Sequence, residues 1–237
     1  MKLMTQHDIE KGFWYYKPEI KFPPYGINLF EDYHEDENLN LFLTNKSEVK
    51  LWSKYLPTLD KVKFLWISSN VNQEIFESVC QMKNLVGLNI ETTTVKNVDK
   101  IANINKLSFL RLANFTKIES VKTLGSLNNL KVLELENFEK ISDFEVIGKL
   151  KNLQGLSICG SMYKAQKIEN IKFVSSLNNL KYLMLINSKM TDKNLDAILN
   201  LKNLETFNSS NNYPTIEFEK LKALTHLKNS NIECLSK

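Results

Sequence analysis

Glycine and cysteine are both scarce in this 237-residue chain, and each scarcity excludes a class of site. The seven glycines are scattered, and neither GxxxxGKS/T nor GxGxxG occurs, so no glycine-rich phosphate loop is expected. The three cysteines are Cys80, Cys159 and Cys234. They form no CxxC pair, which argues against a disulfide framework and a zinc site and is typical of a reducing cytoplasm.

Long apolar runs and clustered histidines are missing as well. No stretch approaches the roughly 18 apolar residues of a membrane helix, and the start, MKLMTQHDIEKG, lacks the apolar core of a secretory signal. The three histidines have no metal-ligand spacing, and the acidic residues 31–37 lack the calcium-loop pattern. We therefore expect a cytoplasmic location, no membrane contact, no metal and no cofactor.

What the chain does contain is an L-x-x-L-x-L unit that recurs along most of its length. The differences between successive middle leucine positions are 24, 23, 22, 23, 23, 27, 24 and 23 residues. These middle positions are Leu41, Leu65, Leu88, Leu110, Leu133, Leu156, Leu183, Phe207 and Ser230.

This ladder resembles leucine-rich repeat proteins of the short-repeat bacterial type, such as the internalins. The resemblance implies an α/β fold, a right-handed solenoid or horseshoe with a parallel sheet on its concave face and short helical or 3-10 segments on its convex face. We predict a repeat domain at residues 39–237, with about nine repeats of 22–27 residues. Residues 1–38 are rich in aromatic residues and are expected to cap the first repeat.

Within each repeat the apolar residues fall on every third position, as in the run from Ile141 through Phe144, Ile147, Leu150 and Leu153. An α-helix would rotate such residues off one face, whereas a 3-10 helix keeps them aligned. The period predicts a short helical segment that leads through a turn into a strand. The polar slots that follow the strands, mostly asparagine, are expected to bond the backbone of the turn.

Alternate residues of each strand should point away from the core, so equivalent positions form columns on the concave face. Two apolar groups stand out in these columns, and exposed apolar patches mark interaction sites. The first group is Phe42, Phe64, Trp66 and Phe109, and the second is Tyr182, Met184 and Ile186. An alternative for Phe42, Phe64 and Trp66 is that they pack beneath the N-terminal aromatic segment.

Between these groups lies Arg111, the only arginine among 31 basic residues, with Glu91, Glu134 and Glu136 on adjacent strands. We predict that the charges of Arg111 and Glu134 align a protein partner on the concave face. The alternative is that they belong to an intramolecular salt-bridge ladder. The one long repeat carries its extra residues within 160–170. Met162 and Tyr163 of that loop should lie beside the Tyr182 group.

The expected function is binding of a protein partner on the concave face, without enzymatic activity, because no catalytic motif is present. The resemblance implies an adaptor or an immunity-type inhibitor of a protein toxin. The alternative is a structural solenoid that associates with itself. Nucleic acid is not an expected partner, because the concave columns contain no lysine, and no small-molecule substrate is expected.

Overall fold

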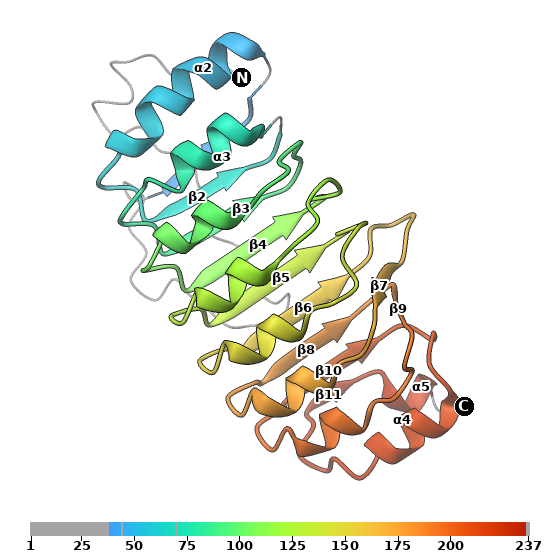
Figure 1. Cartoon of the computed structure of the whole chain (residues 1–237). Coiled ribbons are helices and arrows are strands. Elements are labelled where there is room, and N and C mark those ends of the chain that lie inside the picture. Colours follow the sequence, from blue (N-terminus) through green and yellow to red (C-terminus); the bar gives the residue numbers. More distant parts are fainter. Residues whose placement is uncertain (1–37, 44, 70, 236–237) are drawn as a thin grey trace.

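The structure is a computed structural model that describes residues 38–43, 45–69 and 71–235. Within these residues, nine parallel strands form one sheet, and the helical segments cover one of its faces (Figure 1). In spatial order the strands are β1 (Asn38–Leu41), β2 (Phe64–Ile67), β3 (Gly87–Ile90), β4 (Phe109–Ala113), β5 (Val132–Glu136), β6 (Gly155–Cys159), β8 (Tyr182–Leu185), β10 (Thr206–Ser209) and β11 (Asn229–Ser230). The predicted right-handed leucine-rich repeat solenoid is confirmed. The predicted cap, residues 1–38, lies outside the described residues apart from Asn38.

The covering layer changes character along the solenoid, with α-helices at both ends and 3-10 helices between them. The α-helices are α2 (Lys46–Tyr55), α3 (Gln73–Val79), α4 (Thr215–Leu221) and α5 (Ile232–Leu235). The 3-10 helices are η2 (Leu56–Thr58), η3 (Asp99–Asn103), η4 (Lys122–Ser126), η5 (Glu145–Lys149), η6 (Lys172–Ser176) and η7 (Asp196–Asn200). A separate two-stranded parallel sheet joins β7 (Gln166–Ile168) to β9 (Ser188–Met190).

The apolar period of three coincides with a chain of backbone hydrogen bonds. In the repeat around η4, Leu124 donates its N–H to the carbonyl of Val121 at 2.9 Å, and Leu127 donates to Leu124 at 3.1 Å. Leu130 then donates to Leu127 at 3.0 Å. Each apolar residue thus bonds the apolar residue three positions earlier, and all four are buried. The predicted 3-10 segment is confirmed, and it continues as single turns up to the strand.

The predicted strand register is confirmed from β2 to β11 and is wrong by two residues at β1. Leu39, and not Leu41, pairs with Leu65, so Phe42 lies beyond the strand and is 50% exposed. Leu39, Leu41 and Leu43 are all buried. Because side chains alternate along a strand, a shift of two residues keeps the same set inward, and the apolar pattern cannot distinguish the two registers.

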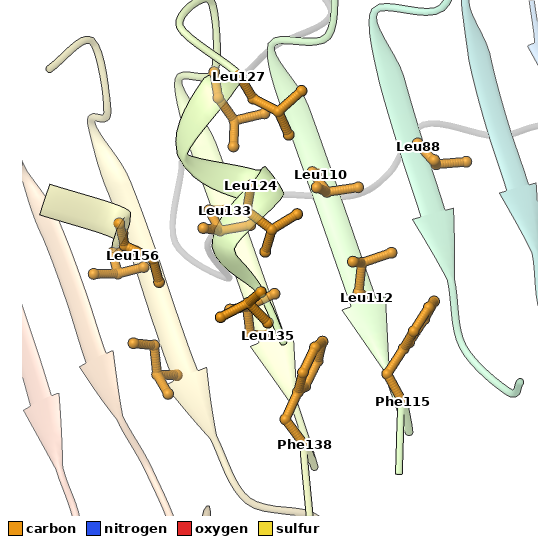
Figure 2. Close-up of a cluster of buried hydrophobic side chains, with 14 of the residues drawn as sticks. Leu88, Leu110, Leu112, Phe115, Leu124, Leu127, Leu133, Leu135, Phe138 and Leu156 are labelled. Carbon is orange, nitrogen blue, oxygen red and sulfur yellow. The ribbon is translucent and has the colours of Figure 1, made fainter. Parts of the chain in front are cut away.

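Aromatic rings extend the leucine core, Phe76 from α3 and Phe115 and Phe138 from just beyond β4 and β5. Phe115 and Phe138 stack with ring centroids 5.7 Å apart, and Phe76 meets Phe115 edge-on at 6.3 Å. Figure 2 shows the two stacked rings beside Leu112 and Leu135 of β4 and β5. These contacts cross repeat boundaries, so each repeat completes the core of its neighbour.

Two ladders of asparagine side chains hold the repeats together at the two ends of the strands. After the strands, Asn114, Asn137 and Asn187 take left-handed φ angles of 61°, 58° and 47°. The Asn114 amide donates to the Glu91 carbonyl at 3.0 Å, which confirms the predicted structural role of this slot. Before the strands, the side-chain amides of a second ladder donate to backbone carbonyls of the preceding repeat, a role that was not predicted from the sequence. Its members are Asn84, Asn129, Asn152, Asn179 and Asn203.

Candidate functional site

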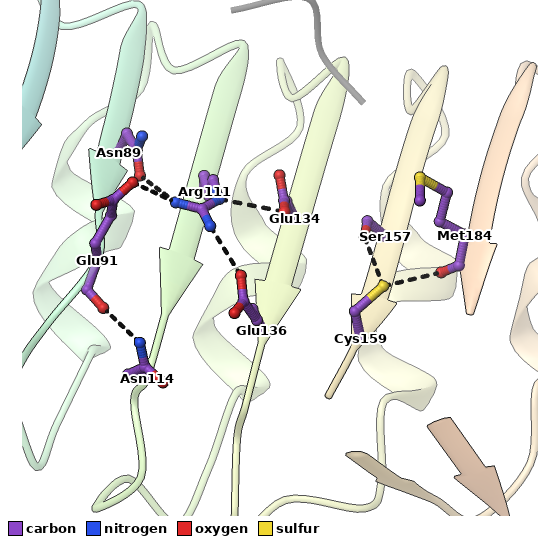
Figure 3. Close-up of polar contacts among 9 residues, drawn as sticks. All are labelled: Asn89, Glu91, Arg111, Asn114, Glu134, Glu136, Ser157, Cys159 and Met184. Carbon is purple, nitrogen blue, oxygen red and sulfur yellow. Dashed lines mark hydrogen bonds and ion pairs between the residues drawn. The ribbon is translucent and has the colours of Figure 1, made fainter. Parts of the chain in front are cut away.

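Arg111 projects from β4 into a cluster of three carboxylates, one directly after β3 and two on β5 (Figure 3). Its guanidinium forms ion pairs with Glu91 at 2.8 Å, with Glu134 at 3.2 Å and with Glu136 at 2.8 Å. It also donates to the Asn89 amide oxygen at 3.3 Å. Four of the five N–H donors of the guanidinium are therefore engaged within the chain. This geometry favours the salt-bridge ladder, and a contact of Arg111 with a partner stays a prediction.

Burial dominates the electrostatics of this cluster. It raises the pKa of Glu134 to about 7, because the charge of Arg111 only partly offsets the loss of water around the carboxylate. Burial lowers the pKa of Arg111, but the charges of Glu134 and Glu136 outweigh it and hold that pKa above its usual value. The Oε2 atom of Glu134 is buried and accepts no hydrogen bond from the described residues. Three carboxylates around one guanidinium make this part of the sheet acidic.

The N-terminal aromatic group does not form the exposed patch that the column pattern predicts. Phe64 and Phe109 are buried, at 7% and 2% exposed, and Trp66 is half-buried. In the strand register, Gly87 lies between Phe64 and Phe109. A Cβ atom on Gly87 would lie 2.6 Å from Cδ1 of Phe64, so the missing side chain makes room for the ring. Packing against residues 1–37, the alternative interpretation, lies outside the described residues.

The outward positions of β8 are occupied by apolar side chains, as predicted. Tyr182 and Met184 are half-buried, and Ile186, directly after the strand, is 36% exposed. Their neighbours on β6 are small, with Gly155 beside Tyr182 and Ser157 beside Met184. The larger side chains of β8 therefore stand above the adjacent strand.

The loop between β6 and β7 is held by several contacts and exposes two large apolar side chains. Met162 is 86% exposed and Tyr163 is 93% exposed. The Ser161 carbonyl accepts from the Asn187 amide at 2.6 Å, and Lys164 forms an ion pair with Glu139 at 2.7 Å. The loop is therefore tied to the repeats on both sides of it.

Gly160 connects this loop to the β8 strand. Its N–H donates to the carbonyls of Ile186 and Asn187, both at 3.1 Å. A Cβ atom on Gly160 would lie 2.3 Å from the carbonyl oxygens of Asn187 and Lys164, so only glycine fits. The loop thus starts beside Ile186, and its two exposed side chains follow within three residues of that point.

Metal-binding groups are not assembled in the part of the chain that the structure describes. No three His, Cys, Asp or Glu side chains there converge in a way that could hold a metal ion. Burial raises the pKa of Cys80 to about 12 and that of Cys159 to about 11, so both thiols stay protonated at neutral pH. No helix among the described residues has the length and apolar character needed to cross a membrane.

Comparison with solved structures identifies the class of this fold, the leucine-rich repeat solenoid. Internalin C2 of Listeria monocytogenes matches with 22% identity and a TM-score of 0.55, over 77% of this chain and 82% of that chain. A leucine-rich repeat protein of Leptospira interrogans matches with 23% identity and a TM-score of 0.61, over 81% and 47% of the two chains. A second Listeria monocytogenes internalin matches with 19% identity and a TM-score of 0.51, over 83% and 68%. No protein-family model matches the sequence, and no curated protein matches it significantly. These likenesses establish the fold and do not by themselves assign a function.

Proposed function

We propose that this chain is a non-enzymatic scaffold that binds a protein partner through a patch formed by β8 and the loop after β6. The patch consists of Met162, Tyr163, Tyr182, Met184 and Ile186. One observation carries the proposal: the loop is held by the contacts of Gly160, Asn187 and Lys164, yet it exposes two large apolar side chains. Solvent disfavours such exposure, and Met and Tyr are enriched at protein interfaces.

The shape of the patch also supports a macromolecular partner. Tyr182 and Met184 on β8 stand beside the small, buried residues Gly155 and Ser157 and so form a raised part of the patch. The described residues contain no group of side chains that could hold a metal ion. An adaptor and an immunity-type inhibitor both act by binding of this kind, and identification of the partner decides between them.

The alternative, a self-associating solenoid, receives less support from the last strand. β11 has only two residues, Asn229 and Ser230, and both are exposed and polar. Short polar edge strands disfavour pairing with a second chain. Sedimentation velocity over a hundredfold concentration range measures this directly, because self-association would raise the mass with concentration.

Three variants test the patch once a partner has been captured and purified. The strand variant carries Tyr182→Thr, Met184→Thr and Ile186→Thr, and the loop variant carries Met162→Ser and Tyr163→Ser. The control variant, Leu199→Ser with Ile216→Ser, removes two exposed apolar side chains from the helical side, which are 37% and 62% exposed. Threonine suits a strand, so the first variant should fold.

Calorimetry should show binding at least about 30-fold weaker for the strand variant, as expected when interface anchors are removed. The loop variant should weaken binding as well, and the control variant should match the unmodified chain. Equal affinity for all four proteins would place the partner elsewhere on the solenoid. A cytoplasmic location stays a prediction, consistent with the three cysteines being free thiols.

A further inference from the structure

Four successive repeats place an exposed lysine directly before a buried apolar residue at one edge of the solenoid. We call these lysines, Lys117, Lys140, Lys167 and Lys189, the lysine edge. The buried residues that follow them are Ile118, Ile141, Ile168 and Met190. The apolar residue anchors the backbone in the core, so the lysine before it must point outward at the same place in each repeat.

The β7–β9 sheet brings two of these lysines into direct register. Lys167 pairs with Lys189 across the two parallel strands, which lie about 4.8 Å apart. Like charges that face each other across a strand pair are destabilising. The arrangement therefore lowers the stability of the free chain, unless something outside the sheet neutralises it.

Some lysines of the solenoid form ion pairs with a carboxylate of another repeat. Lys100 contacts Glu77 at 2.9 Å, and Lys228 contacts Glu205 at 2.8 Å, in each case across a repeat boundary. On the lysine edge, only Lys140 has such a partner, Glu119, among the described residues. Lys117, Lys167 and Lys189 have no carboxylate within ion-pair distance in the same part of the chain. Three of the four lysines of the edge are thus unpaired among the described residues, and what distinguishes them is their equivalent place in successive repeats.

We propose that the lysine edge binds an acidic, extended segment of a protein. Four positions at strand spacing cover about 14 Å, the length of roughly four to five extended residues. Glu119 and Glu169 lie two positions after Lys117 and Lys167, and these carboxylates would repel a continuous phosphate backbone. A polypeptide can instead place carboxylates against the lysines and other residues against the glutamates, and charge complementarity of this kind selects partners.

This inference goes beyond the proposed function, because it uses different residues and can hold if the β8 patch fails its test. The probe is a fluorescein-labelled octaglutamate peptide, and its binding is followed by fluorescence anisotropy at low and at physiological salt. The edge variant carries Lys117→Gln, Lys167→Gln and Lys189→Gln. The matched control carries Lys61→Gln, Lys83→Gln and Lys202→Gln, three exposed lysines elsewhere that are also without an ion pair among the described residues. Both variants lose the same charge, and thermal unfolding by circular dichroism verifies that both are folded.

The edge variant should bind the peptide about tenfold more weakly, whereas the control should change less than twofold. A third variant with arginine at the same three positions should keep the affinity, because it restores the charge. Equal losses in the edge and control variants would show that only net charge matters and would overturn the proposal. Binding of a 12-base-pair DNA duplex that is tighter than peptide binding and equally sensitive to the edge would also overturn it, in favour of nucleic acid.

Discussion

Replacing Arg111 by methionine tests whether the charge cluster on β3 to β5 stabilises the fold. The change leaves Glu91, Glu134 and Glu136 without the guanidinium that all three contact within 3.2 Å. An exposed ion pair is worth about 0.2–1 kcal/mol, whereas leaving a buried charge unpaired costs about 3–5 kcal/mol. The four side chains are only 16–31% exposed, so we expect the free energy of unfolding to fall by about 3 kcal/mol.

The assay is urea unfolding at pH 7, followed by far-ultraviolet circular dichroism and by tryptophan fluorescence, with coincidence of the two curves as the test of two-state behaviour. Adding Glu134→Gln to Arg111→Met removes one unpaired charge and should recover about 1 kcal/mol, so the two changes should not be additive. Arg111→Lys is the matched control, because a single ammonium keeps the charge but cannot bridge three strands, and its cost should be intermediate.

Two results would refute this reasoning. A cost below about 1 kcal/mol for Arg111→Met would place the cluster with ordinary surface pairs. A cost that stays the same at pH 4 would also contradict it, because protonation of the glutamates should relieve the repulsion that the missing cation leaves behind.

Three further predictions concern stability. The pKa of Glu134 is raised from 4.5 to about 7, so the native state holds a proton that the unfolded state loses. The stabilisation from this proton is present below about pH 4.5 and is lost as the pH rises through 7. The difference in urea midpoint between the unmodified chain and Glu134→Gln should change with pH in the same way. Leu133→Ala should lower the free energy of unfolding by about 2–5 kcal/mol, because the side chain is fully buried. Leu133→Asp should abolish cooperative unfolding, and an aspartate variant that still unfolds cooperatively would contradict the core position of Leu133. Asn137→Gly should lower the free energy of unfolding by about 1 kcal/mol, because it removes the hydrogen bond to Asn114. Asn137→Val should lower it further, because valine disfavours a φ of 58°. Equal thermal midpoints for the two variants would show that this turn is not strained.

The interior of the solenoid could be predicted because it repeats. Leu65, Leu88, Leu110 and Leu133 stand at near-equal steps, and each step supports the register of the next, which the pairing confirms. At β1 the same logic fails by two residues, because only one neighbour constrains Leu39 and an apolar alternation tolerates that shift. The core register could thus be predicted where several neighbouring repeats share the same spacing.

The surface could be predicted only where the position of a side chain follows from its own strand and not from neighbouring strands. The outward place of β8 follows from alternation within one strand, so Tyr182 and Met184 lie where expected. The close approach of the Phe64 ring to Gly87 is a relation between neighbouring strands, which the column pattern of the sequence does not include. The clustering of three carboxylates on Arg111 was visible in the columns, but the number of its simultaneous contacts depends on side-chain conformations.

The extra residues of the sixth repeat form a surface that the repeat pattern does not require. Across this insertion Leu156 still pairs with Leu183, so the added length leaves the core register unchanged. Gly160 begins the loop at a position where no side chain fits, and Met162 and Tyr163 then extend into solvent. Packing requires Gly160 and the leucines but does not require the two exposed side chains. Their apolar character therefore needs a cause outside the fold, and contact with another protein supplies one.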